Sequence, residues 1–132
     1  MGIAEIAKKW IEGMNRHNVD EMFSLCTEDL IGLEIAEGKP NHGLNAVRES
    51  YVDLFRGFPD CKCEILNVFS GDDQVLIEVQ WSGTNNGSFR EESPTNKFVD
   101  VRIAYIFKFR GNKISQITEY YDGAAVAAQM GN

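Results

Sequence analysis

The sequence predicts an α+β fold in which helices come first and a curved antiparallel sheet follows. Up to Phe58 the apolar residues recur at the 3.6-residue spacing of amphipathic helices, and from Cys61 onward they alternate with polar residues, as in strands. Helices that are followed by strands are typical of α+β proteins, in which the helices pack on one face of the sheet. With 132 residues, 43% of them hydrophobic, we expect a single domain spanning residues 1–132.

Two helices are expected at the N-terminal end. The first covers residues 1–15, where one apolar stripe follows the i, i+3, i+4, i+7 pattern. The stripe consists of Ile3, Ile6, Ala7, Trp10, Ile11 and Met14. After a polar break at residues 15–18, a second and shorter helix is predicted from Val19 to Cys26, with Asn18 or Asp20 as its N-cap.

A short strand and a third helix are predicted next. Residues Leu30 to Ile35 form the strand candidate, and the polar segment 37–43 is expected to be a loop. The third helix carries its apolar residues at helical spacing until Gly57 and Pro59 end it. These apolar residues are Leu44, Val47, Tyr51, Leu54, Phe55 and Phe58.

The rest of the chain predicts long antiparallel strands that are joined by turns. The strands are expected at Cys61–Phe69, 75–81, 99–109 and Lys113–Tyr121, with a turn at 70–73 and a long loop from Gly83 to Asn96. Strict alternation in the two middle strands means that each of them buries one face. The Ala-rich residues 124–129 are predicted to add a short terminal helix.

The net charge of the chain indicates which classes of binding partner to expect. Thirteen Lys and Arg residues stand against twenty Asp and Glu residues, so the formal net charge is −7. This charge repels phosphate backbones and anionic lipid surfaces, and we therefore expect neither nucleic acid nor a membrane as a partner. We see no signal peptide and no apolar run of about 18 residues, so the expected compartment is the cytoplasm.

The three cysteines, Cys26, Cys61 and Cys63, are predicted to be buried free thiols. Their number is odd, and the chain contains no CxxC or HxxxH spacing that would indicate a zinc or redox site. The sequence also lacks a glycine-rich phosphate-binding loop. We therefore expect neither a metal nor another cofactor.

Several strings that are spread over nearly the whole chain carry a further signal. They are IEGMNRHNVDEMFSLCTEDL, GLNAVRESYVDLFRGFPDCKCEI, VQWSGTNNGSF, SPTNKFV, IFKFRGNKI and EYYDGAAVAAQMG. In this order they resemble the SnoaL-like polyketide cyclase branch of the nuclear transport factor 2-like, or ketosteroid isomerase-like, superfamily. The resemblance implies a cone-shaped barrel whose strongly curved sheet wraps the helices around a deep, mostly apolar cavity. It also implies a homodimer formed through the outer face of the sheet.

The resemblance further implies a catalytic pair and a ligand. Cyclases of this branch use an acid on the last strand for aldol ring closure, helped by a polar donor on the preceding strand. These positions fall on Glu119 and Tyr105, where the cyclases carry an aspartate and a histidine. The candidates for the pocket lining are Trp81, Asn85, Glu34 and Tyr121. The expected ligand is a small apolar or carbonyl-containing molecule that undergoes cyclisation or isomerisation without a cofactor.

The loop after Phe109 decides which acid of the last strand can face the cavity. If this loop has two residues, Tyr105 lies opposite Thr118. Because side chains alternate between the two faces of a strand, Glu119 would then point away from the cavity, and Asp122 would point into it.

A loop of three residues, 110–112, gives the other register. It brings Glu119 to the face of Tyr105, which then lies opposite Ile117. We favour this bulged register because it also places Ile117 and Tyr121 among the apolar side chains of the neighbouring strand. Burial on this face would raise the pKa of Glu119 and make its carboxylate a better proton acceptor near neutral pH.

Structural roles remain open for the same residues. Glu119 could be a buried acid bonded to a tyrosine or to Arg102, and Asp122 could cap the terminal helix. The whole chain could be a non-catalytic ligand-binding or dimerisation module with the same fold. Addition of water to an epoxide is a third option, but the Asp-Arg-Asp set that it needs has only scattered candidates here.

Overall fold

The computed structural model describes residues 2–131 and confirms the α+β class. The helices are α1 (Ile3–Asn15), α2 (Val19–Ser24), α3 (Leu44–Gly57) and α4 (Gly123–Gln129). The strands are β1 (Cys26–Glu34), β2 (Lys39–His42), β3 (Lys62–Ser70), β4 (Gln74–Thr84), β5 (Phe98–Arg110) and β6 (Lys113–Tyr120). Elements therefore occur near where the periodicity of the sequence predicts them, with one additional strand, β2. The predicted second helix was too long, because Cys26 is the first residue of β1, which begins four residues before the predicted strand.

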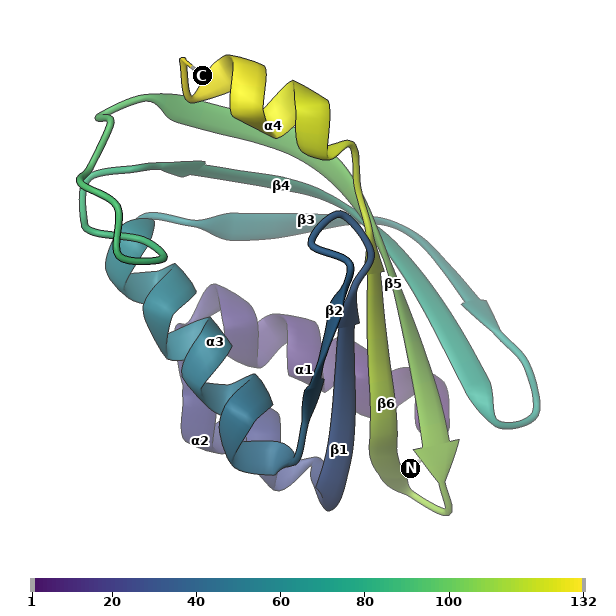
Figure 1. The fold of residues 1–132 in the computed structure, drawn as a ribbon. Helices are drawn as coiled ribbons and strands as arrows, with labels where there is room; N and C mark the ends of the chain where they lie inside the picture. The colour runs from purple at the N-terminus through teal and green to yellow at the C-terminus, as the bar shows by residue number, and fades with distance from the viewer. Residues whose placement is uncertain (1, 132) are drawn as a thin grey trace.

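The six strands form one curled sheet in the order β2-β1-β6-β5-β4-β3. Figure 1 shows that the long strands bend around α1, α2 and α3, while α4 lies at the far end of the sheet, where it contacts β5. The sheet is mixed, because β1 runs parallel to β6 and the other neighbours are antiparallel. The expectation of a wholly antiparallel sheet was wrong on this point. Parallel neighbours need a long connection, and the chain between β1 and β6 supplies one.

Strand β2 was missed because it carries no burial signal. The segment 37–43 was predicted to be a loop, yet Lys39–His42 pairs with the end of β1. All four residues of β2 are exposed, so no apolar alternation marks them. Pro40 fits such an edge strand, since an edge position needs no donor on its outer side.

The core lies between the concave face of the sheet and the helices. Trp10 of α1 is fully buried and makes edge contacts with Tyr51, Tyr105 and Phe107 at centroid distances of 5.2, 5.5 and 5.3 Å. Strands β4 and β5 bury every second side chain, as the sequence predicts. The three cysteines are free and buried, and burial raises the pKa of the Cys61 thiol to about 12, so it stays protonated.

The β5–β6 hairpin combines a tight turn with a bulge. Arg110 pairs with Lys113, so the loop has two residues, with Gly111 at φ 61° in the first position, as in a type II′ turn. The predicted three-residue loop was therefore wrong. Between Ile114 and Gln116 the register shifts by one residue, which leaves Ser115 as the extra residue of a β-bulge.

This bulge determines the face of Glu119. Beyond Ser115 the register places Glu119 directly opposite Tyr105, and not two residues away as the three-residue loop would have required. The prediction that Glu119 lies on the face of Tyr105 was correct, although a bulge at Ser115 produces this register and a three-residue loop does not. Thr118, which a bulge-free tight turn would set against Tyr105, pairs with Ile106 and faces the other way.

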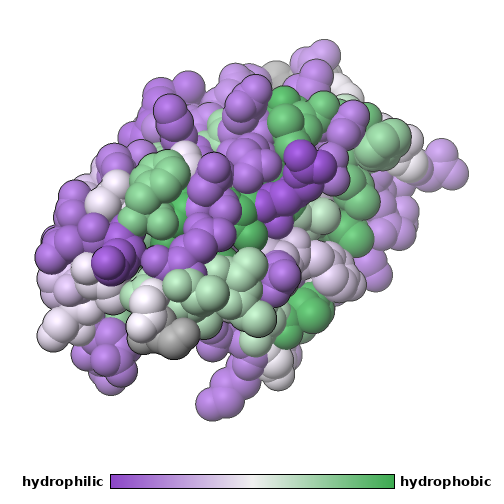
Figure 2. All heavy atoms as spheres, turned by 90° about the horizontal axis from the view of Figure 1, so that it is seen from above, coloured by the Kyte–Doolittle hydropathy of each residue, from purple (hydrophilic) through white to green (hydrophobic). Residues whose placement is uncertain are grey.

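The outer face of the sheet carries several apolar side chains among polar ones. Strand register places Phe69, Leu76 and Ile106 side by side there, and Phe69 is 63% exposed. Figure 2, which views the molecule from the α4 side, shows hydrophobic groups separated by hydrophilic ones. The homodimer stays a prediction. Among the helices of residues 2–131, none has the length and apolarity that crossing a membrane requires.

Replacing Phe107 by alanine should lower the free energy of unfolding by about 3–5 kcal/mol. Its ring is fully buried against Trp10, so the change removes apolar contacts and leaves a cavity. The neighbouring Lys108 is exposed, and Lys108→Ala should change the value by only about 0.5 kcal/mol. Urea unfolding followed by circular dichroism measures both, and equal losses would contradict the one-sided burial of β5.

Candidate active site

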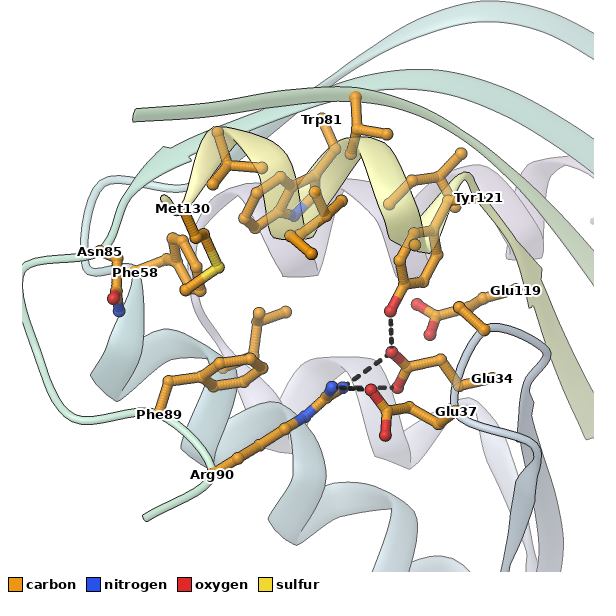
Figure 3. A pocket seen from close by; sticks show the side chains of 18 of the residues that line it. Glu34, Glu37, Phe58, Trp81, Asn85, Phe89, Arg90, Glu119, Tyr121 and Met130 are labelled. Atoms are coloured by element: carbon orange, nitrogen blue, oxygen red, sulfur yellow. Dashed lines mark hydrogen bonds and ion pairs between the residues drawn. The ribbon is translucent and has the colours of Figure 1, made fainter. Parts of the chain in front are cut away.

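A cavity of about 960 Å³ opens between the sheet, α3, α4 and the loop that joins β4 to β5. Its walls are largely apolar. They include Leu54, Phe58, Trp81, Val101, Ile103 and Val126. Figure 3 shows the polar residues Glu34, Glu37, Arg90 and Glu119 gathered on one side of the space, with Phe58 and Met130 across from them and Phe89 next to Arg90. The cavity can therefore hold a largely apolar molecule with one polar end.

Glu119 lies at this polar side and is half-buried. Strand β6 places it between two neighbours at the same level, Tyr105 on β5 and Glu34 on β1. The hydroxyl of Tyr51, which comes from α3, donates a hydrogen bond of 2.7 Å to Oε1 of Glu119. Three separate elements thus fix the position of one carboxylate.

The environment raises the pKa of Glu119 from 4.5 to about 7. Burial is the largest cause, because it disfavours the charged form, and the negative charge of Glu34 adds to it. The hydroxyls of Tyr51 and Tyr105 and the charge of Arg90 act in the opposite direction and stabilise the carboxylate. A group with a pKa near 7 can both accept and return a proton at neutral pH.

Tyr105, the predicted donor, is fully buried beside Glu119. Its hydroxyl lies 3.7 Å from the sulfur of Met14, which is a weak acceptor. Burial, together with the charge of Glu119, raises the pKa of Tyr105 well above its ordinary value. The phenol therefore stays protonated, and its hydroxyl lies near enough to the Glu119 carboxylate to stabilise the charged form of that group.

Tyr51 was missed as a site residue. Its spacing matches that of the other apolar residues of α3, and it was predicted to be an ordinary core residue. Its ring is indeed buried, at 6% exposure, but its hydroxyl bonds to Glu119. The available signal was chemical, since a buried tyrosine needs a partner for its hydroxyl.

A second polar group surrounds Glu34 (Figure 3). Arg90 donates to both carboxylate oxygens of Glu34, at 2.9 and 2.7 Å, and also pairs with Glu37. The hydroxyl of Tyr121 donates to Glu34 as well, and burial raises the pKa of that phenol. The structure thus brings the predicted pair Glu34 and Tyr121 together, and adds Arg90, which sequence reasoning had left inside a loop.

Trp81 and Asn85 lie on the apolar side of the cavity. The indole of Trp81 is nearly buried and meets the Phe58 ring edge-on at 5.1 Å. Asn85 is 1% exposed, and its amide nitrogen donates to the carbonyl oxygens of Gly57 and Gly87. Its oxygen accepts bonds from the backbone and the side chain of Thr95. The Asn85 amide therefore holds its own loop together and has no free group for a ligand.

The same loop fits tightly against the end of α3. A Cβ atom on Gly87 would lie 2.0 Å from the carbonyl oxygen of Arg56, so only glycine allows this approach. Together with Asn85, this contact fixes the base of the loop. The tip of the loop, which carries Arg90, lies farther along.

Asp122 has a structural role. Its carboxylate accepts a 3.0 Å bond from the backbone N–H of Ala125 and caps α4, which confirms the capping alternative. Glu119 and Asp122 thus have different surroundings, since one lies in the cavity and the other caps a helix. Within residues 2–131 no cluster of three His, Cys, Asp or Glu side chains is arranged to hold a metal ion.

Comparison with protein families gives one match over almost the full length. The family described as SnoaL-like polyketide cyclase matches residues 4–130. Among the curated proteins, none matches the chain.

Solved structures share the fold at low identity. A candidate SnoaL-like polyketide cyclase from Jannaschia sp. CCS1 is 18% identical, with a TM-score of 0.89 over 97% of this chain and 90% of that one. IdmH, a candidate polyketide cyclase from Streptomyces antibioticus, is 16% identical, with a TM-score of 0.82 over the whole of both chains. A protein with a ketosteroid isomerase-like fold from Catenulispora acidiphila is 21% identical, with a TM-score of 0.81 over 96% and 92%. At these identities the likeness concerns the fold.

Replacing Tyr51 by phenylalanine should raise the pKa of Glu119 further, by about one pH unit. The phenol hydroxyl stabilises the ionised carboxylate, and its loss favours the protonated form. Carboxyl-carbon NMR titration measures the shift. Tyr120→Phe is the matched control, because Tyr120 is adjacent to Glu119 in sequence but 47% exposed, and it should leave the titration unchanged. A shift of the same size in both variants would exclude the specific role of Tyr51.

Replacing Asn85 by alanine should lower the free energy of unfolding by about 2–4 kcal/mol. The change removes the Asn85 bonds to the carbonyls of Gly57 and Gly87 and leaves the N–H of Thr95 without its partner. Asn67, which is exposed and bonds only to Glu78, serves as the control, with an expected change of about 0.5 kcal/mol. Chemical denaturation of the two variants gives the comparison.

Proposed function

Because the chain belongs to the SnoaL-like polyketide cyclase family, we propose that it catalyses cofactor-free proton transfer beside a carbonyl group of a small, largely apolar ligand. The outcome would be aldol ring closure or isomerisation. The observation that carries the proposal is Glu119, a half-buried carboxyl group with a pKa of about 7 at the polar side of a 960 Å³ cavity. Such a group matches the requirement for a general base that works near neutral pH.

The proposed reaction begins when the Glu119 carboxylate removes a proton from the carbon next to a ligand carbonyl. The electron pair of the C–H bond moves into an enolate, whose oxygen becomes negative. In a cyclisation, the enolate carbon attacks a second carbonyl carbon of the same molecule, and the new alkoxide takes the proton back from Glu119. In an isomerisation, the ligand carries a carbon–carbon double bond next to the deprotonated carbon, so the electron pair spreads into a dienolate. The proton returns to the far carbon of that dienolate, and the double bond moves into conjugation with the carbonyl.

Tyr105 is the proposed donor to the developing oxygen charge. Its hydroxyl lies next to Glu119, whose charged form it stabilises, and 3.7 Å from the Met14 sulfur, a weak acceptor that a negative oxygen would replace. Tyr51, by contrast, already donates to Glu119 and orients it. The two phenols therefore have different roles in the proposed mechanism. A tyrosine donor beside a carboxylate base also occurs in ketosteroid isomerase, a general example of this chemistry.

Two substrate-binding roles complete the proposal. Trp81 forms an aromatic wall against which a flat, apolar ligand could lie. Glu34 and Tyr121 border the polar end, where the ligand carbonyl would be placed near Glu119. Asn85 contributes by shaping the wall, since its polar atoms are all used within the loop.

Replacing Glu119 by glutamine should abolish the proton transfer while keeping the cavity. The assay is the exchange of deuterium from heavy water into the acidic C–H positions of an aromatic 1,3-diketone, monitored by proton NMR. We expect this exchange to be at least about 100-fold slower in the variant. Binding of the diketone, measured by tryptophan fluorescence, should change little. Equal exchange rates in the two proteins would exclude Glu119 as the base, and binding without any exchange in the native protein would favour the ligand-binding alternative.

The same variant should be more stable than the native protein above pH 7. The folded-state pKa of Glu119 is raised from 4.5 to about 7, so between these values the folded state binds more protons than the unfolded state. Stability therefore falls as pH rises through this window. Glutamine does not ionise, so the variant does not lose stability in this pH window. We expect its free energy of unfolding to exceed that of the native protein by an amount on the order of 2 kcal/mol at pH 8 and by almost nothing at pH 4. Thermal unfolding at the two pH values tests this; a loss at pH 8 would contradict it.

A further inference from the structure

Arg90 reaches across the polar side of the cavity from the tip of the β4–β5 loop (Figure 3). A tight turn presents it, in which the backbone of Phe89 and that of Glu92 exchange bonds of 3.1 and 2.9 Å. Both central residues, Arg90 and Glu91, are left-handed, at φ 50° and 64°. For residues other than glycine this conformation costs on the order of 1 kcal/mol each, so other contacts must hold the turn in place.

Those contacts are concentrated on Arg90. Its backbone N–H donates 2.9 Å to a carboxylate oxygen of Asp53 on α3, and its guanidinium lies 4.6 Å from the centre of the Phe89 ring. Its two terminal nitrogens then pair with Glu34 and Glu37, which belong to the β1–β2 end of the sheet. One side chain thus connects the loop on one side of the cavity with a strand end on the other.

The strand end that Arg90 reaches is the one beside the proposed base. Glu34 and Glu119 are partners in the parallel pair of β1 and β6, so their backbones are about 4.8 Å apart, and both line the cavity. One carboxylate has a cation against both of its oxygens, while the other accepts a bond from the neutral phenol of Tyr51. Two adjacent carboxylates repel each other, and a cation on one of them reduces that repulsion.

We propose that Arg90 is a positioning residue for the base: by pairing with Glu34 across the cavity, it controls the negative charge that lies beside Glu119. The inference rests on the proposed role of Glu119 and adds to it a residue that never touches the reacting atoms. When the loop tip holds Arg90 against Glu34, the charge beside Glu119 is compensated in part, because the same guanidinium also pairs with Glu37. When the tip moves away, Glu119 faces an uncompensated carboxylate and holds its proton more tightly.

The other groups around Glu119 bear on the same titration and come from every element packed against it. They are Tyr51 on α3, Tyr105 on β5, Cys63 on β3, Glu34 on β1, Tyr121 just after β6 and Arg90 on the loop. The phenols and the thiol all stay neutral at pH 7, because burial raises the pKa of each. Glu34 and Arg90 are thus the two charged groups of this set. The charge of Glu34 raises the pKa of Glu119, and that of Arg90 lowers it.

The test is a double-mutant cycle of Arg90→Gln and Glu34→Gln, read by NMR titration of the Glu119 carboxyl carbon. We expect Glu34→Gln to lower the pKa of Glu119 and Arg90→Gln to raise it, each by about 0.5–1 unit. In the Glu34→Gln background, Arg90→Gln should shift it by less than about half as much, because the guanidinium has then lost the two hydrogen bonds to Glu34 that hold its charge near Glu119. Arg90→Lys, which keeps the charge, should recover most of the native value.

Arg56→Gln is the matched control. Arg56 pairs with Asp53 on the same side of the cavity but is absent from its lining, so the Glu119 titration should stay the same. Arg90→Gln is uninformative if it loosens the loop. In that case Glu34→Gln alone still tests whether the charge of Glu34 acts on Glu119, since this variant leaves the Arg90–Glu37 pair in place. An unchanged Glu119 titration in Glu34→Gln, or an equal effect of Arg90→Gln in both backgrounds, would overturn the proposal.

Activity separates this proposal from the proposed function. With a diketone substrate, the acidic limb of the exchange rate should move to higher pH in Arg90→Gln by the amount that the NMR shift shows, with the maximal rate largely kept. If the native protein catalyses no exchange but the titrations couple as expected, the proposed function fails while the charge control by Arg90 stands. If exchange depends on Glu119 but the titrations do not couple, the reverse holds.

Discussion

The pairing of β5 with β6 determines which side chains meet inside the cavity. A two-residue turn alone would point Glu119 outward, and one extra residue, Ser115, shifts the register so that Glu119 lies opposite Tyr105. From that position the carboxylate meets Tyr51 from α3 and lies level with Glu34 on β1. The surroundings of Glu119 follow from this register, including the burial that raises its pKa.

The cost of this arrangement falls on stability. A carboxyl group whose pKa is raised by burial is held less favourably as an anion than it would be in water. Packing of the surrounding core offsets this loss of stability, because Trp10 packs edge-on against three aromatic rings and the inner faces of β4 and β5 are buried throughout. Local rules of folding are commonly broken at functional sites, and Glu119 fits that pattern.

Much of the fold could be predicted from the sequence because its burial is periodic. Helix α1 and strands β4 and β5 place one face in the core, and that face shows as a regular apolar pattern. Strand β2 is exposed on all four residues and leaves no such pattern. The bulge at Ser115 carries no glycine or proline to mark it, so the turn type could not be chosen correctly from the loop residues. Tyr51 and Arg90 escaped notice for another reason, since their importance comes from partners that only the folded chain brings near.

The base and the tip of the loop between β4 and β5 are held by different contacts. Asn85 uses all of its hydrogen-bonding capacity at the base, and Gly87 presses against the end of α3. The turn at residues 89–92 depends on contacts made by its own side chains. In evolutionary terms this makes the loop modular: substitutions at the tip can alter the molecules that the cavity admits and the charge beside Glu119, while the sheet and its register stay as they are.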